Sequence, residues 1–189
     1  MPAIKSTLYF LEIFPKKTPF DDNEFDVIMT LSLFEHILDL PGALKEIRRI
    51  LSPNGYLLIH YGPVWTSAVG HHLYSQAGDD FLDFTRGQIP AHIHLLCSAD
   101  EIKNFYLSKG YSEAQIQSVL FWFNGTDIIN RLPFETYIQQ FTIFFSVVCS
   151  SLMYHDLPYE HIDTLRCRYP HISDFSTYGG NFLLKNRKQ

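Results

Sequence analysis

Residues Phe25–Tyr61 read FDVIMTLSLFEHILDLPGALKEIRRILSPNGYLLIHY, and this stretch decides the fold. Its first seven residues, Phe25–Leu31, form a near-continuous apolar run with β-branched content, which predicts a strand buried on both faces in a parallel sheet. Apolar residues then recur every three or four positions over Pro41–Leu51, with Asp39 as a candidate N-cap, so we expect a helix there. A second buried strand is predicted over Tyr56–Tyr61. Strand, helix and strand at this spacing predict a βαβ unit with parallel strands.

The remainder of the chain continues the alternation of helices and strands. A stop signal at Ser52–Gly55 ends the first helix, because proline cannot continue it and its asparagine and glycine can take a positive φ. Farther on, Ser98 and Glu101 have capping-box spacing ahead of a helix that runs to the Lys109-Gly110 stop. Further helices are expected over Phe134–Phe141 and Glu160–Arg168, and further strands over Thr142–Cys149 and Asn181–Lys185. We therefore expect an α/β fold in one domain, residues 1–189, with a helical insertion at about 64–130.

The composition excludes several classes of protein. Hydrophobic residues make up 46% of the chain and charged residues 19%, which argues against a disordered tail and against a coiled coil. The net charge of −5 provides no basic field for a phosphate backbone, so nucleic-acid binding is not expected. A soluble globular protein is the expected class.

Cysteine usage and the longest apolar tract bear on the compartment. The three cysteines, Cys97, Cys149 and Cys167, are odd in number and widely spaced, which argues against a disulfide framework and for a reducing, cytoplasmic location. Their apolar or helical surroundings predict core thiols. The tract Phe141–Met153 is too short to span a bilayer and contains threonine and serine, so we expect a buried element and no membrane span.

Several elements in Pro19–Pro63 occur in a characteristic order. The chain shows "PF" at Pro19-Phe20, an acidic turn at Asp21-Asp22, "EH" at Glu35-His36, and a helix stop of the form R-x-L-x-P-x-G at Arg49–Gly55. In this order the stretch resembles the second half of the class I S-adenosylmethionine-dependent methyltransferases that act mostly on small molecules. The carboxyl-terminal pattern, Asn130-Arg131-Leu132 before a helix and Tyr178–Lys185 as a last strand, is also similar.

The resemblance implies a Rossmann-like methyltransferase fold with the family's strands in the order 4-5-7-6. It also implies S-adenosylmethionine as cofactor and a small-molecule or lipid-like methyl acceptor. The glycine-rich loop that holds the cofactor in this family has no counterpart here, since no G-x-G-x-G string occurs and only about twenty residues precede the acidic turn. We therefore expect a chain that lacks the family's glycine-rich amino-terminal half and binds the cofactor weakly or not at all. Ile4–Phe14 is interpreted as a remnant of strand three or a substitute edge.

Without the family's first strand, Phe25–Leu31 becomes an exposed sheet edge. Unpaired amides and carbonyls at such an edge pair with another segment or promote aggregation. We expect Ser6–Phe14 to fold back on this edge, or a second copy or a separate partner chain to cover it.

The resemblance also indicates candidate site residues near the carboxyl ends of the parallel strands, where open α/β sheets bind ligands. Three residues would face the cofactor: Leu31, Ser32 and His36. Four residues of the insertion would contact the acceptor: Trp65, His71, His72 and His94. No catalytic residue is assigned, because methyl transfer requires alignment more than a dedicated triad.

Two alternatives remain open for the histidines and for the whole chain. The pairs His71-His72 and His92-x-His94 could ligate a metal. However, neither pair has the i, i+4 spacing of helical metal ligands, and no neighbouring Cys or Glu completes a recognised motif. No metal site is therefore assigned. The chain could also be a non-catalytic interaction module, or half of a split enzyme, that docks through its open strand edge. A histidine-based metal hydrolase is the most distant alternative.

Overall fold

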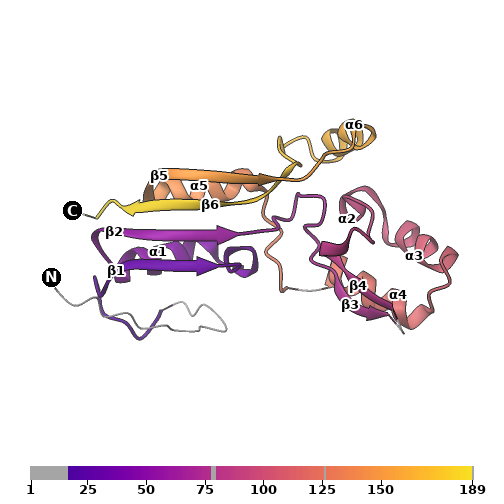
Figure 1. Cartoon of the computed structure of the whole chain (residues 1–189), viewed down its shortest axis with the longest axis horizontal. Helices are drawn as coiled ribbons and strands as arrows, with labels where there is room; N and C mark the ends of the chain where they lie inside the picture. Colours follow the sequence, from indigo (N-terminus) through magenta and orange to yellow (C-terminus); the bar gives the residue numbers. More distant parts are fainter. Residues whose placement is uncertain (1–16, 78–79, 126, 189) are drawn as a thin grey trace.

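The computed structural model describes residues 17–77, 80–125 and 127–188. Its main sheet has four strands in the order β1 (Phe25–Leu31), β2 (Leu51–Tyr61), β6 (Thr177–Asn186) and β5 (Phe145–Tyr154) (Figure 1). β1 and β2 are parallel, whereas β6 runs antiparallel to both of its neighbours. This confirms the α/β class and the expected strand order.

The βαβ unit predicted from the sequence forms. Helix α1 (Leu40–Ile50) begins where Asp39 accepts a hydrogen bond from the backbone N–H of Gly42 at 3.0 Å, so the predicted N-cap is confirmed. β2, however, begins at Leu51 rather than at Tyr56. The expected stop signal therefore lies inside the strand, as an irregularity in its pairing with β1, and Asn54 takes a φ of 62° there.

One face of the sheet carries the main hydrophobic core. Helices α1 and α5 (Phe134–Phe144) lie along this face (Figure 1). Tyr61 of β2 and Phe182 of β6 both contact Phe141 of α5, with ring centroids 5.8 and 5.3 Å apart respectively. The helical residues expected to point inward, Tyr137 and Phe141, are buried. Alternate apolar positions of the strands thus meet the apolar stripes of two helices.

The other face of the sheet is open, which corrects the expectation that Phe25–Leu31 is buried on both faces. Val27, Met29 and Leu31 are 55, 60 and 62% exposed. Successive strand residues point to opposite faces, and no element of the described residues covers this one. In the described chain β1 also pairs with β2 alone, so it is the expected edge strand. The proposed covering segment Ser6–Phe14, and the interpretation of Ile4–Phe14, lie outside the described residues.

The carboxyl-terminal part differs from expectation in detail. Helix α5 continues to Phe144 before β5 begins, so the first residues of the strand predicted over Thr142–Cys149 are helical. Most of β5 is exposed, because it is the other edge strand and its outer face is open, and the tract Phe141–Met153 is consequently not a buried element. Cys149 of β5 is exposed for the same reason and is not a core thiol.

Helix α6 (Tyr159–Arg168) forms where it was predicted, but it also exposes its cysteine. Cys167 lies on the solvent side of this largely polar helix, and Cys97 is only half-buried. The expectation of core thiols is therefore wrong for Cys149 and Cys167. Among the described residues, no helix combines the length and the apolar character needed to cross a membrane.

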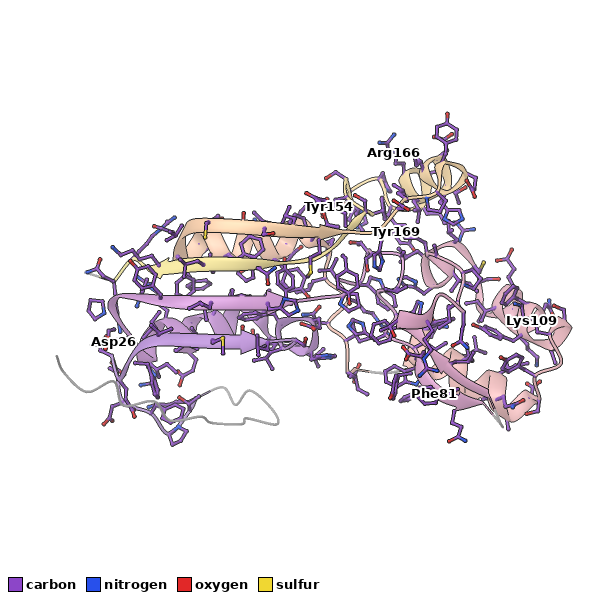
Figure 2. The ribbon with its side chains drawn as sticks, in the orientation of Figure 1. Asp26, Phe81, Lys109, Tyr154, Arg166 and Tyr169 are labelled. Carbon is purple, nitrogen blue, oxygen red and sulfur yellow. The ribbon has the colours of Figure 1, made fainter. Side chains whose placement is uncertain are left out.

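The segment between β2 and α5 contains strands as well as helices. Its elements are β3 (Tyr74–Ala77), β4 (Asp80–Asp83), η2 (Phe84–Arg86), α2 (Ile93–Leu96), α3 (Ala99–Ser108), α4 (Glu113–Leu120) and η3 (Phe121–Gly125). The predicted capping box is confirmed, since Ser98 N donates to Glu101 Oε2 at 2.7 Å. Residues such as Ile102, Tyr106 and Phe123 form a separate apolar cluster here. This insertion lies beyond the carboxyl ends of β1 and β2, so Lys109 lies at the opposite end of the molecule from Asp26 (Figure 2).

Candidate functional site

A backbone hydrogen bond joins the carboxyl ends of the parallel strands β1 and β2. The backbone N–H of Ser32, directly after β1, donates to the carbonyl of His60 in β2 at 2.8 Å. Ser32 is exposed and takes a φ of 46°, which turns the chain sharply away from the strand. Leu31 is exposed beside it. Two of the three predicted cofactor-side residues, Leu31 and Ser32, therefore lie at the carboxyl end of β1, the end of the sheet at which open α/β folds bind ligands.

A short helical turn, η1 (Phe34–His36), follows and contains a buried acid. Glu35 is only 1% exposed, and its Oε2 has no hydrogen-bond partner in the structure. Burial raises the pKa of this carboxyl to about 7, although hydrogen bonds from the backbone N–H groups of Glu35 and Gly62 oppose the shift. Burying a carboxyl oxygen without a hydrogen-bond partner costs folding free energy, so Glu35 marks a candidate functional site.

The segment Ile128–Asn130 holds η1 in place. Asn130 Nδ2 donates to the carbonyls of Phe34 and Ile37, at 2.7 and 3.0 Å. The amide oxygen of Asn130 accepts from the hydroxyl of Tyr137 at 2.7 Å, which links η1 to helix α5. His36 Nδ1 lies 2.8 Å from the Ile128 carbonyl. These bonds fix the direction in which Glu35 and His36 point.

His72, in the turn after β2, lies next to His36 of η1. This turn is tight, because a β-carbon at Gly70 would lie 2.2 Å from the carbonyl oxygen of Trp65. The ring of His72 is buried and its centroid is 5.4 Å from that of His36. Burial lowers the pKa of His72 to about 4, so the imidazole is neutral at pH 7.

A second group of aromatic side chains lies deeper in the insertion. The ring of His94 is 4.6 Å from that of Trp65 and 5.0 Å from that of His71. His94 Nε2 donates to the Trp65 carbonyl at 2.8 Å, and His71 Nδ1 accepts from the backbone N–H of Leu73 at 2.9 Å. Burial lowers the pKa of His94 to about 3 and that of His71 well below its usual value. The group is therefore aromatic, polar and uncharged.

The structure thus divides the four predicted acceptor-side residues. Trp65, His71 and His94 lie together, whereas His72 faces His36, which was expected on the cofactor side. His92 is separate, since its Nε2 donates to the carbonyl of Phe175 at 2.9 Å.

Sequence reasoning missed two residues of the site. Glu35 was read as part of the "EH" pair, and its burial depends on long-range packing. Asn130 was noted only as part of the pattern Asn130-Arg131-Leu132 before a helix. An acid within the apolar run LSLFEHIL was the one sequence signal that could have identified Glu35 as more than a surface residue.

Comparison with known proteins finds similarity to methyltransferases. Residues 6–59 match the family model described as a methyltransferase domain. A 41-residue stretch is 42% identical to an uncharacterized methyltransferase of Schizosaccharomyces pombe, and this match covers 22% of the chain and 15% of that protein. The chain thus spans only a small part of this curated relative.

Solved structures with a similar arrangement include several methyltransferases. A SAM-dependent methyltransferase of Thermotoga maritima, described as a possible histamine N-methyltransferase, is 13% identical with a TM-score of 0.39, covering 92% of this chain and 60% of that one. A putative Haloferax volcanii methyltransferase in complex with its Trm112 activator is 14% identical with a TM-score of 0.43, covering 95 and 61%. These likenesses are too distant to transfer a substrate or a partner.

Proposed function

We propose that the chain, whose residues 6–59 match a methyltransferase domain, takes part in transferring a methyl group from S-adenosylmethionine to a small-molecule or lipid-like acceptor. The observation that carries this proposal is the junction of the loop after β1 with the turn after β2, at the carboxyl ends of the parallel strands. The three free cysteines fit a reducing compartment such as the cytoplasm.

On the cofactor side, we assign Leu31, Ser32 and His36 to contacts with S-adenosylmethionine. Leu31 is the last residue of β1, Ser32 follows it directly, and His36 ends the short turn η1. Ser32 presents an exposed hydroxyl on a sharply turned backbone, where a ligand can approach closely.

On the acceptor side, we assign the group Trp65, His71 and His94. Neutral imidazoles and an indole can contact an apolar or polar uncharged molecule without the desolvation cost of a charged side chain. Transfer from a sulfonium requires the acceptor atom in line with the methyl group, so the main task of this group is orientation. His72 is not part of this group, because its ring contacts His36 on the cofactor side.

Calorimetric titration of S-adenosylmethionine into the whole chain tests the proposal, in buffer with and without EDTA so that metal effects are separate. Because the glycine-rich loop has no counterpart here, we expect binding that is weak but saturable, and we expect Leu31→Trp to reduce it below detection. Val27→Trp is the matched control, because Val27 lies on the same strand and face with similar exposure but at the other end. Absence of binding at millimolar cofactor, or equal effects of the two variants, would contradict the proposal.

The open sheet face favours a second candidate function, that of an interaction module or one half of a split enzyme. In this role a second copy or a partner chain would cover β1 (Phe25–Leu31) and its exposed apolar side chains. A groove of about 370 Å³ lies on this face between β1, β2, β6 and β5. A monodisperse monomer whose β1 amides exchange rapidly with solvent would exclude this alternative.

A further inference from the structure

Three side chains capable of binding a metal converge from two segments. Glu35 and His36 belong to η1, after β1, and His72 belongs to the turn after β2. One potential ligand atom from each residue lies within 4.8 Å of the other two. We refer to these residues as the Glu35–His36–His72 group. The sequence predicts no such site, because Glu35 and His36 are distant in sequence from the histidine pairs of the insertion.

Both imidazoles are oriented for ligation. His36 Nδ1 lies 2.8 Å from the carbonyl of Ile128, and His72 Nδ1 lies 2.9 Å from the carbonyl of Gly70. Because a carbonyl only accepts, each Nδ1 carries the hydrogen, which leaves the lone pair of the neutral ring on Nε2. His72 Nε2 is buried and has no hydrogen-bond partner. Histidines that bind metals have this arrangement, with the second ring nitrogen donating to a carbonyl.

The carboxylate completes the donor set. Glu35 is buried and its Oε2 has no partner, so the group contains two unpartnered buried polar atoms, Glu35 Oε2 and His72 Nε2. Asn130 fixes the turn that bears Glu35 through its bonds to Phe34 and Ile37. Buried polar atoms are rarely left without a partner, and a cation would satisfy both.

We propose that the Glu35–His36–His72 group binds one divalent transition-metal ion, with zinc as the first choice, through the two Nε2 atoms and a Glu35 oxygen. Two imidazoles and one carboxylate are a donor set typical of zinc and related ions. Ligand atoms about 2.0–2.2 Å from a tetrahedral metal lie roughly 3.4 Å apart, so separations of up to 4.8 Å must shorten by up to about 1.4 Å on binding.

Three protein ligands leave a coordination position for water or for an oxygen or nitrogen donor of a bound molecule. Zinc sites that act on substrates have this open pattern, whereas structural sites have four protein ligands. The open position would lie at the carboxyl ends of β1 and β2, where a ligand of the sheet also binds. Metal binding at the group is independent of methyl transfer and holds whether or not the chain binds S-adenosylmethionine.

The test uses the whole chain without a histidine tag. Protein is stripped with a chelator, dialysed and titrated with Zn²⁺ by calorimetry at pH 7.5, and Co²⁺ is added in parallel as an absorption probe. We expect one Zn²⁺ per chain and visible Co²⁺ bands of a low-symmetry nitrogen–oxygen site. His36→Gln is the main variant, because His36 lies at the surface and outside the hydrophobic core. We expect at least about a 100-fold loss of Zn²⁺ affinity, since even outer-sphere changes cost 10–100-fold.

His171→Gln is the matched control, an exposed histidine in the loop after α6 and outside the group. It should retain the affinity of the original chain. Glu35→Gln preserves side-chain shape and should abolish the Co²⁺ bands, with circular dichroism verifying that the variant is folded. Substoichiometric zinc in the original chain would overturn the proposal. So would equal affinities of the His36 and His171 variants, because the metal would then bind elsewhere.

Discussion

The two faces of the main sheet are built from similar apolar residues but have different surroundings. Leu57 and Ile59 of β2 point to the face covered by α1 and α5 and are buried. Leu58, between them, points to the open face, where Met29 and Leu183 flank it in register. The hydrophobicity of a strand therefore shows that both of its faces could be buried. It does not show that other elements of the chain cover both faces.

The largest effect should come from the covered face. Phe141 is fully buried against Phe34, Tyr61 and Phe182. Phe141→Ala should reduce the free energy of unfolding by about 3–5 kcal/mol, because it removes apolar contacts and leaves a cavity. Denaturant unfolding followed by circular dichroism measures this loss. Phe121→Ala, at a half-exposed ring, is the control and should cost less than about 1 kcal/mol. Similar losses for both would show that the two environments do not differ.

The next largest effect should come from Asn130, whose hydrogen bonds hold the turn η1 at the end of the covered face. Asn130→Ala leaves the carbonyls of Phe34 and Ile37 and the hydroxyl of Tyr137 without their partner. We expect a loss of about 2 kcal/mol in unfolding free energy. Tyr137→Phe, which removes only one of these bonds, should cost about 1 kcal/mol. If the two variants were equally stable, Asn130 would not hold the turn.

A pH-dependent effect on the free energy of unfolding should come from helix α1, which packs on the covered face of the sheet. Glu46 accepts hydrogen bonds from Arg49 and from the backbone and hydroxyl of Thr18, and these partners, Arg49 foremost, lower its pKa to about 2. A lowered folded-state pKa stabilises the fold above the unfolded value of about 4.5, and the contribution disappears as pH falls toward 2.

Glu46→Gln should therefore cost about 1–2 kcal/mol at pH 7, a value discounted for the solvent near Arg49, and the difference from the original chain should vanish between about pH 4.5 and 2. Urea unfolding at a series of pH values measures it. A difference that stays constant over this range would contradict the assignment of the stabilisation to the charged carboxylate.

The smallest effect should come from the open face, and it sharpens the comparison within one strand. Met29 points to the open face and its neighbour Ile28 to the covered one, where it packs against the core. Met29→Thr should change the unfolding free energy by less than about 0.5 kcal/mol, and Ile28→Thr should cost about 1–2 kcal/mol. Denaturant unfolding at low and high protein concentration measures both. A comparable loss for Met29→Thr would mean that another chain covers the open face in solution.

Elements whose signals are local were predictable from the sequence. The strand Phe25–Leu31, the N-cap of α1, the capping box of Ser98 and Glu101, and helix α6 all formed as expected. The predicted boundary between α5 and β5 was wrong, because the helix continues into residues whose local sequence favours a strand. The threonine at position 142 is β-branched, yet it lies inside α5, where its hydroxyl donates to the carbonyl of Ile138 at 3.0 Å.

The candidate site was predictable only in part. Leu31 and Ser32 were placed correctly at the end of β1, since a residue that follows a strand directly lies at its end. The grouping of Trp65, His71 and His94 was expected, but the separation of His72 from it was not. Adjacent residues in a tight turn point in different directions, and the sequence does not specify which.

By itself, the sequence determined the order of helices and strands, their caps and the methyltransferase resemblance of the segment after Pro19, because these depend on residues near one another in the chain. Only the tertiary structure decided which sheet face is covered, that Glu35 is buried, and that His36 and His72, distant in sequence, lie 5.4 Å apart. The physical reason is that burial and side-chain convergence depend on contacts between segments that meet only after folding.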